Sequence, residues 1–292
     1  MTDQLAAQFE ENRTQLRSVA YRMLGSLSEA EDAVQEAWLR LNRSDVSEVA
    51  NLGAWLTTVV SRVCLDMLRS RKSRREDSLE VHVPDPVVTK LDPEEEAVQF
   101  DAVGLAMLVV LDTLAPAERL AFVLHDMFGV SFDEIAEIVD KSPAATRQLA
   151  SRARRRVMGA PASDRDPGRH REVVDAFIAA SRSGDFEALL ALLDPEVVLR
   201  ADAGTPADAT ANPAHSKIVR GALAVVEQAL TFTKMAPYTR PALVNGTPGI
   251  ITVVNGRLMG VMHLTISAGR ITQINILADH TRLANHPAGR AF

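Results

Sequence analysis

The feature that most constrains the fold of this chain is a change in hydrophobic spacing about half-way along it. Up to residue 157, apolar residues recur at intervals of three and four, the spacing of amphipathic helices. After Pro195 the apolar runs are short, rich in β-branched residues and separated by turn signals such as Asn255-Gly256 and Ala268-Gly269. The sequence therefore predicts a multidomain protein in which a helical half precedes an α+β half.

The helical half is itself interrupted by an acidic stretch that contains Pro84, Pro86 and Pro93. Such a composition disfavours a packed core and favours an extended linker. A hypothesis from the order of charges is that acids such as Asp92 and Glu94 compete for basic surfaces nearby. We expect a helical domain at 1–75, a linker at 76–100, a helix-turn-helix domain at 101–158, a linker at 159–168 and an α+β domain at 169–292.

The α+β half should open with helices and continue with strands. His170 to Leu193 has the pattern of two helices that are broken at Gly184-Asp185. Alternating or continuous β-branched runs predict strands further on. These strands are expected at Val197–Arg200, Gly249–Val254, Leu258–Ile266 and Ile271–Leu277.

Composition narrows the classes of function. The chain has 292 residues, enough for two or three domains, and 47% of them are hydrophobic. Its single cysteine, Cys64, excludes an internal disulfide and a multi-cysteine zinc site. There is no secretory-signal pattern and no apolar run of about 18 residues that could span a membrane. A cytoplasmic protein is expected, with no metal and no cofactor.

The distribution of charge says more than its sum. A net charge of −6 taken alone argues against a nucleic-acid binder. The basic residues, however, gather in two blocks, Arg69 to Arg75 and Arg147 to Arg156, and acids dominate the stretch that follows the first block. Each block lies at or near the end of a predicted helix. Although a solvated helix face could produce one such block, two favour the binding of a polyanion.

The second block lies in a predicted helix-turn-helix. Phe132 to Val139 has helical spacing, a short polar turn follows, and a second helix should run from Pro143 to Val157. In this layout the second helix enters the major groove, where arginine reads guanine, glutamine reads adenine and other cations hold phosphates. A merely solvated basic helix is the alternative. The predicted DNA contacts are Arg147, Gln148, Ser151, Arg152, Arg154 and Arg155, with Leu149, Ala150 and Ala153 packed inward.

Two earlier helices carry further polar surfaces. Ser28 and Glu31 predict a capping box at the start of the first of these helices. Its solvent side carries a polar ridge that suits a protein partner, formed by Asp32, Gln35, Glu36 and Arg40. An ordinary amphipathic helix explains this ridge equally well. The next helix, from Leu52 to Leu68, ends in the first basic block. Hydrogen-bonding groups beside cations suit unpaired bases. Its exposed side should carry Thr57, Thr58, Ser61, Arg62 and Asp66, around a core aromatic, Trp55.

In this order and spacing, the three segments resemble extracytoplasmic-function sigma factors of the sigma-70 family. Residues 32–38 resemble the region 2 helix that docks on core RNA polymerase, residues 54–75 the segment that melts and reads the minus-ten element, and residues 131–156 the region 4 reader of the minus-thirty-five element. The resemblance implies promoter-specific transcription initiation. It implies polymerase contacts at Asp32, Gln35 and Trp38, and region 2 DNA contacts at Asn51, Trp55, Arg62, Asp66, Arg69, Arg71 and Lys72.

The α+β half resembles the SnoaL-like domain that one subgroup of these factors carries. Val83 to Val87 is similar to the proline-containing linker motif of that subgroup. Two other motifs depart from the subgroup. Of the glycines usual after Asp202 only Gly204 is present, and residues 278–283 match the C-terminal motif loosely. The resemblance implies that this domain regulates the factor in cis, without a separate anti-sigma protein. The regulatory residues would be Pro84, Pro86, Asp202 and Asp279.

Two other functions could use the same residues. An enzyme built on the α+β domain would need Asp202, His215, His263 or Asp279 in an apolar cavity, but only His263 lies within a clear predicted strand, so no enzyme is expected. Sensing of a small ligand and a protein-only lock both stay open for this domain. The competing function for the whole chain is a ligand-controlled helix-turn-helix regulator that acts without polymerase, which leaves the two earlier helices unexplained.

Overall fold

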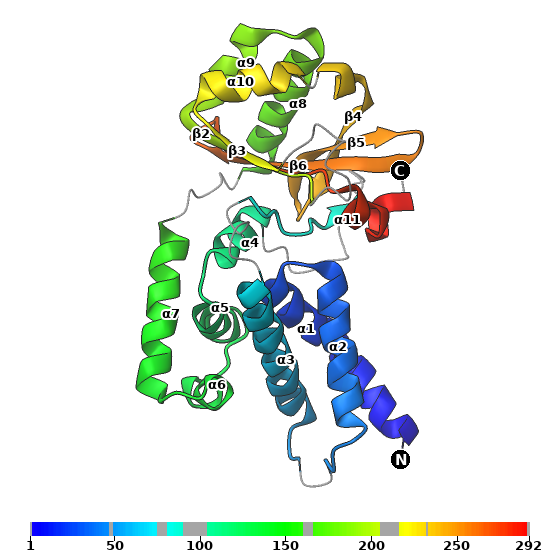
Figure 1. Ribbon diagram of the computed structural model, residues 1–292, viewed down its shortest axis with the longest axis vertical. Helices are drawn as coiled ribbons and strands as arrows, with labels where there is room; N and C mark the ends of the chain where they lie inside the picture. Colours follow the sequence, from blue (N-terminus) through cyan, green and yellow to red (C-terminus); the bar gives the residue numbers. More distant parts are fainter. Residues whose placement is uncertain are drawn as a thin grey trace. The chain divides into compact units, whose positions relative to one another are not determined.

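The computed structural model describes residues 2–46, 49–74, 81–89, 104–159, 166–204, 216–231 and 233–290 (Figure 1). The chain forms two compact units. The first joins Met1–Leu79 to Val110–Gly159, and the second joins Glu80–Val109 to Ala160–Phe292. The described part of the first unit is helical, whereas the second contains helices and a sheet. The predicted fold class is therefore confirmed.

The first unit brings both predicted helical regions into one packed body. Helix α3 contacts α1 and α2 and also the more distant α5. Its helices are α1 (Thr2–Leu24), α2 (Leu27–Leu41), α3 (Leu52–Arg74), α5 (Pro116–Phe122), the π-helical turn η1 (Val123–Met127), α6 (Phe132–Val139) and α7 (Pro143–Met158), while α4 (Leu105–Asp112) spans the boundary between the units.

A buried charge holds the two helical regions together. Arg119 of α5 is 2% exposed, and its Nε donates to the Arg22 carbonyl oxygen of α1 at 3.0 Å. The same guanidinium pairs with Asp112. A charge is retained in a core only where such partners compensate for its lost hydration. The sequence pattern, which separated residues 1–75 from 101–158, contains no signal for this pairing.

The predicted start of α2 was wrong by two residues. The N-cap is Ser26, whose hydroxyl accepts from the Glu29 N–H at 3.4 Å, and Ser28 lies exposed inside the first turn. Gly25, at φ 68°, ends α1 and leads directly into the extended Ser26. A capping box does occur at the start of α6, between Ser131 and Glu134.

The second unit is built on a sheet with the order β1-β4-β5-β6-β7-β2-β3. Its neighbours are antiparallel except for the parallel pair β2 and β7. The described elements are β1 (Val88–Thr89), α8 (Pro167–Ser183), α9 (Phe186–Leu192), β2 (Leu193–Asp202), β3 (Lys217–Arg220), α10 (Ala222–Thr231), η2 (Thr233–Tyr238), β4 (Thr239–Val244), β5 (Thr247–Val254), β6 (Arg257–Ser267), β7 (Arg270–Leu277), α11 (His280–Ala284) and η3 (Pro287–Arg290).

Helices α8, α9 and α10 cover one face of this sheet (Figure 1). Phe177 of α8 and Leu199 and Leu264 of the sheet belong to the core between them. The four predicted strands, both predicted turns and the helix break at Gly184 are confirmed. Strands β1, β3 and β4 were missed because each is short or interrupted by proline or polar residues.

Part of the predicted linker is a strand of the second unit. Val88 and Thr89 form β1, which pairs antiparallel with β4 in the register Val88↔Val244 and Thr89↔Leu243. Residues 81–89 of the predicted linker are therefore held against the sheet of the second unit. The acids proposed to compete for basic surfaces, Asp92 and Glu94 to Glu96, lie outside the described residues, as does His215.

Candidate nucleic-acid interface

The predicted helix-turn-helix is present in α6 and α7. Asp140 adopts a left-handed conformation at φ 55° and ends α6. Ser142 then caps α7 by accepting from the Ala145 N–H at 3.2 Å, and Pro143 occupies the first turn. Ala150 and Ala153 are buried, as predicted, whereas Leu149 is only partly buried.

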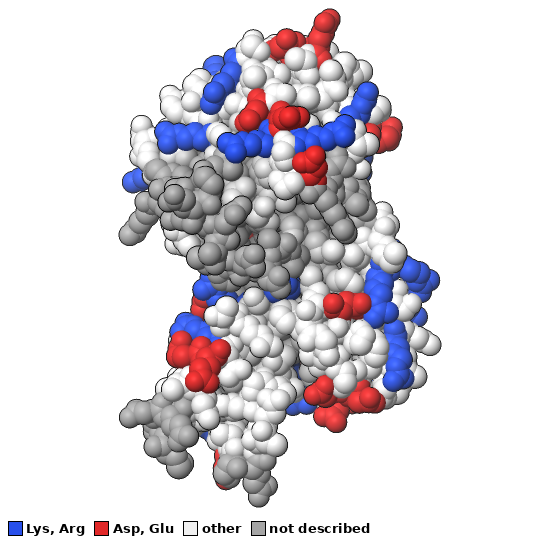
Figure 2. All heavy atoms as spheres, turned by 180° about the vertical axis from the view of Figure 1, so that it is seen from behind, with Lys and Arg blue, Asp and Glu red and all other residues white. Residues whose placement is uncertain are grey.

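The outer face of α7 carries the predicted DNA-binding side chains. Figure 2 shows a column of basic side chains on the helical unit on the side of α7. Arg154 differs from the others because it is partly buried and its Nε donates to Asp126 Oδ1 at 2.5 Å. The predicted residues that lie exposed are Arg147, Gln148, Ser151, Arg152 and Arg155.

Two residues of the turn before α6 support this face and were missed from the sequence. The His125 ring stacks on Phe132 with centroids 3.8 Å apart, and the Arg147 guanidinium lies 5.5 Å from the Phe132 centroid. Asp126, the next residue, pairs with Arg154. Helical periodicity cannot reveal these contacts because the turn is a π-helix with five residues, Val123–Met127.

Helix α3 presents a mixed polar face. Asn51 is exposed, and its Oδ1 accepts from the Ala54 N–H at 3.0 Å at the start of the helix. Arg62, Asp66 and Arg69 are exposed, with Arg69 3.8 Å from Asp66. Trp55 is partly buried. These residues lie along one helix, as predicted.

Two residues expected on the exposed side of α3 are buried. Thr57 is 7% exposed and Ser61 is 0% exposed, so this part of the prediction was wrong. Helix α3 contacts α5 and α6 in addition to α1 and α2, and small side chains allow helices to approach closely. Thr57 satisfies its hydroxyl by donating to the Gly53 carbonyl oxygen at 2.8 Å.

The basic tail of α3 is not uniform. Arg71 donates to the Leu24 carbonyl oxygen at 3.1 Å and pairs with Glu29, so its guanidinium ties α3 to the α1–α2 turn. Arg69, by contrast, is exposed. The side chain of Lys72, the third predicted contact in this tail, lies outside the described residues.

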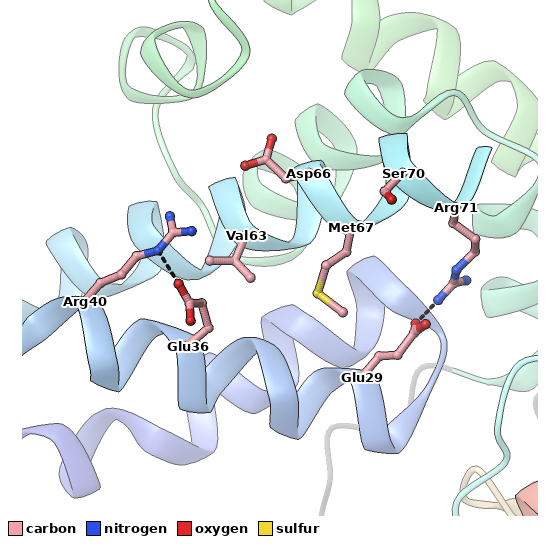
Figure 3. A pocket seen from close by; sticks show the side chains of 8 residues that line it. All are labelled: Glu29, Glu36, Arg40, Val63, Asp66, Met67, Ser70 and Arg71. Atoms are coloured by element: carbon pink, nitrogen blue, oxygen red, sulfur yellow. Dashed lines mark hydrogen bonds and ion pairs between the residues drawn. The ribbon is translucent and has the colours of Figure 1, made fainter. Parts of the chain in front are cut away.

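A groove of about 630 Å³ runs between α2 and α3 (Figure 3). Val63 and Met67 of α3 supply its apolar part. Ion pairs lie toward its two ends, from Arg40 Nε to Glu36 Oε1 at 2.9 Å and from Arg71 to Glu29. The remaining lining residues are Asp66 and Ser70.

The predicted polymerase contacts lie on α2 but outside this lining. Asp32 and Gln35 are exposed. Trp38 is partly buried, and its ring packs on Phe9 of α1 with centroids 5.0 Å apart. Trp38 thus contributes to the helical core as well as to the surface.

In the second unit, Asp202 and Arg282 hold the segment 81–89 against the sheet. Asp202 Oδ2 accepts from the Val83 N–H at 3.0 Å and from Arg282 Nη1 at 2.8 Å, and it lies 3.3 Å from His82 Nδ1. Arg282 also donates to the Val83 carbonyl oxygen at 2.6 Å and pairs with Asp85. Burial by itself would raise the pKa of Asp202, but the hydrogen bonds from His82 and Val83 and the charge of Arg282 outweigh it and lower that pKa.

Asp279 acts on the same contact indirectly. Its Oδ1 accepts from the Thr281 N–H at 2.8 Å and from the Arg282 N–H at 3.1 Å, which caps α11. Capping fixes the start of the short helix that carries the Arg282 side chain. We use the name linker clamp for five residues: Asp202, Asp279, Arg282, Asn245 and His286. The contacts of the last two are described next.

Pro84 and Pro86 are buried within the held segment. The Pro86 carbonyl oxygen accepts from His286 Nε2 at 2.6 Å. Asn245 Oδ1 accepts from the Val87 N–H at 3.0 Å, and the Asn245 N–H donates to the Val87 carbonyl oxygen at 2.7 Å. Proline lacks an N–H, so neither proline leaves a buried donor unsatisfied here. The four predicted regulatory residues therefore belong to one contact.

His263 has the properties of a structural histidine. It is 2% exposed in β6, and its Nε2 lies 3.2 Å from Thr247 Oγ1. Burial, with a smaller effect of His170, lowers its pKa to about 3. Asp202 and Asp279 are occupied in the linker clamp. Among the described residues, no group of His, Cys, Asp or Glu side chains could hold a metal ion.

The similarities of this chain to known proteins agree with this geometry. Residues 8–74 match the model of Sigma-70 region 2, and residues 105–157 match that of Sigma-70 region 4. The chain is 43% identical over 278 residues to the ECF RNA polymerase sigma factor SigJ of Mycobacterium tuberculosis, covering 92% of this chain and 87% of the relative. It is 36% identical to the probable ECF sigma factor SigI of the same species, covering 96% and 95%.

A solved structure supports the relationship over the whole fold. The crystal structure of SigJ from Mycobacterium tuberculosis matches with a TM-score of 0.70 and 36% identity, covering 97% of this chain and 99% of that one. In the part of the chain that the structure describes, no helix is both long and apolar enough to cross a membrane. By its sequence and by its structure, the chain belongs to the extracytoplasmic-function sigma factors of RNA polymerase.

Proposed function

We propose that the two helical regions of this sigma factor divide promoter recognition between them. A sigma factor is a transcription factor that acts with core RNA polymerase at promoter DNA, and that much follows from the family. For this chain we assign region 2 to residues 1–75 and region 4 to residues 101–158. The ligand-controlled regulator that acts without polymerase is not favoured, because it has no use for region 2.

Region 4 is proposed to read the minus-thirty-five duplex with α7. The observation that carries this proposal is the exposed face of α7, where Arg147, Gln148, Ser151 and Arg152 lie clear of the core of a helix-turn-helix. A free arginine fork can bond guanine in the major groove, and exposed cations can hold phosphates. Arg154 and Arg155 complete the proposed set.

Region 2 is proposed to bind the unpaired minus-ten strand with α3. Arg62 and Asp66 offer hydrogen bonds, Arg69 offers a cation and the partly buried Trp55 an aromatic ring, all on one helix. Asn51 at the helix start belongs to the same proposed surface. Single strands are bound by such combinations of polar, aromatic and cationic groups.

Polymerase docking is proposed for α2. Asp32 and Gln35 are exposed beside the groove between α2 and α3, whose apolar part and flanking ion pairs suit side chains of a partner helix. We propose that Trp38 supports this surface by packing on Phe9. Action with core polymerase on promoters places the protein in the cytoplasm.

The experiment that tests these roles is transcription in vitro with core polymerase on pooled promoter fragments. Start sites that depend on the protein should share two elements, and Arg147→Ala should change the preference at the upstream element while Arg62→Ala changes that at the downstream one. Specific binding to duplex DNA by the chain alone, without initiation by the holoenzyme, would contradict the proposal.

The α+β domain is proposed to restrain the factor in cis through the linker clamp. The clamp holds residues 81–89, which connect region 2 to region 4, so it shortens the free connection between the two DNA-binding regions. Ligand sensing and a protein-only lock are the alternatives that the sequence leaves open for this domain, and the direct contacts with the linker favour the lock. On this proposal no separate anti-sigma factor is needed.

The restraint can be tested by opening the clamp in the full chain. Arg282→Met removes the ion pairs to Asp85 and Asp202 and should raise promoter output in the same assay. Arg257→Met, at the exposed end of β6, removes the same charge outside the clamp and serves as the control. Unchanged output would contradict regulation through the linker, and lower output would mean that the domain assists.

A further inference from the structure

The π-helical turn Val123–Met127 has a structural role that goes beyond joining α5 to α6. We propose that it is a positioning element for promoter reading, in which Asp126 orients Arg154 directly and His125 orients Arg147 through the ring of Phe132. The inference rests on the proposed reading of the minus-thirty-five element by α7. It adds positioning residues that do not themselves touch DNA.

The first arm of this element is an ion pair. Arg154 Nε donates to Asp126 Oδ1 at 2.5 Å, with side-chain exposures of 40% and 23%. Only the Nε edge of the guanidinium is engaged in this contact, so its remaining N–H groups can still reach a base or a phosphate. A charge-assisted bond to one edge of a planar group fixes the direction in which the other edge points.

The second arm is a stack of three side chains. The rings of His125 and Phe132 lie 3.8 Å apart between centroids at an interplanar angle of 27°, and Arg147 lies 5.5 Å from the Phe132 centroid. His125 is itself fixed, since its Nδ1 lies 2.9 Å from the Val130 carbonyl oxygen. A carbonyl can only accept, so Nδ1 carries the proton. The stack places Arg147 by a cation–π contact.

The π-turn explains why two consecutive residues can serve both arms. A five-residue turn is wider than an α-helical one and re-aims the side chains within it. It is closed by the Val130 N–H donating to the Leu124 carbonyl oxygen at 2.9 Å, and Gly129 turns the chain at φ 70°. His125 is thereby directed to Phe132 and Asp126 to Arg154.

The two supported arginines are suitably spaced for reading one groove. Arg147 and Arg154 are seven residues apart, two helical turns or about 10 Å along α7, and so lie on the same face. Orienting both side chains before binding reduces the rotamer entropy that binding must remove. Asp126 also partly neutralises Arg154, which weakens its attraction to DNA of any sequence. The expected result of both effects is greater discrimination between promoters.

The test measures discrimination rather than activity alone. Holoenzyme made with the full chain transcribes its own promoter and versions with single base-pair changes in the minus-thirty-five element. Asp126→Asn should lower discrimination by about five- to tenfold at the base pair where Arg154→Ala acts, within the range of one bidentate contact. The double variant should be no worse than Arg154→Ala, and Asp126→Glu should restore part of the loss.

The stacked arm has a matched test. Phe132→Leu keeps an apolar side chain but removes the ring, and it should lower discrimination at the base pair where Arg147→Ala acts. Glu137→Gln removes one exposed charge from α6 away from both arms and should leave discrimination unchanged. Thermal unfolding of each variant separates loss of positioning from loss of folding.

The outcomes separate this inference from the function on which it rests. If Arg147→Ala and Arg154→Ala alter the preference but Asp126→Asn and Phe132→Leu do not, the positioning role is wrong and reading by α7 stands. If neither arginine variant alters the preference while transcription continues, reading by α7 fails and the inference fails with it.

Discussion

The surface of α7 and the linker clamp use arginine in opposite ways. On α7, Arg147, Arg152 and Arg155 are exposed, and the contacts that do exist leave donor edges free. In the clamp, the Arg282 guanidinium bonds Asp85, Asp202 and the Val83 carbonyl oxygen within the protein. The difference lies in how many donors the fold satisfies. An arginine whose donors are left to solvent is available to a partner, and one whose donors are satisfied holds the chain together.

The largest expected effect concerns Arg119, which is more deeply buried than Arg282. Arg119→Met should lower the free energy of unfolding of the helical unit by about 3–5 kcal/mol, because it removes the buried guanidinium from its ion pair with the partly buried Asp112. Urea unfolding followed by the fluorescence of Trp38 and Trp55, both in this unit, measures it. Arg43→Met, at an exposed site, is the control. A loss below 1 kcal/mol would show that burial does not make this arginine structural.

A smaller effect is expected at the clamp, where Arg282 is 22% exposed. Arg282→Met should lower the free energy that protects residues 81–89 from opening by about 2 kcal/mol, because it removes charge-assisted bonds that solvent partly screens. Hydrogen exchange of peptides that cover this segment measures it, with strands β6 and β7 as an internal reference. Equal protection in both proteins would show that β1 pairing alone holds the linker.

The buried His263 should make the stability of the second unit depend on pH. Its pKa falls from the ordinary 6.5 to about 3 in the folded chain, so only the unfolded chain takes up this proton between those values. Burial of the neutral His263 therefore contributes fully to the stability of the folded chain above pH 6.5. Below that pH the free energy of unfolding decreases by up to about 1.4 kcal/mol per pH unit.

Hydrogen exchange of β6 and β7 at pH 6.5 and pH 5.5 measures this loss after correction for intrinsic exchange. The His263→Gln variant, which cannot be protonated in this range, should lack this share of the pH dependence. The same dependence in the variant and in the parent chain would assign it to other groups.

The smallest effects are expected for the exposed arginines of α7. Arg152→Ala should weaken promoter binding by a similar factor for all sequences and reduce the salt dependence by about one phosphate contact. Fluorescence anisotropy of holoenzyme with labelled promoter across a potassium chloride series measures it. Sequence-dependent weakening would instead make Arg152 a base-reading residue.

Several parts of the candidate interface could be predicted from the sequence because their signals are local. The turn and cap before α7 and the buried Ala150 and Ala153 depend on residues within a few positions of one another. The strands of the second unit and their turns, such as Asn255-Gly256, are equally local. The three- and four-residue spacing was too coarse for α3, where it placed Thr57 and Ser61 on the exposed side although both are buried.

By itself, the sequence determined the helical and α+β halves, the helix-turn-helix and the basic residues of α7, because hydrophobic period and capping act over a few residues. Only the tertiary structure decided which charges stay inside the protein. Arg282 meets Asp85 across 197 residues, and Arg119 meets the Arg22 carbonyl oxygen across 97. Neither contact produces a periodic pattern in the sequence, because a long-range contact requires only that two groups lie close together in the folded chain.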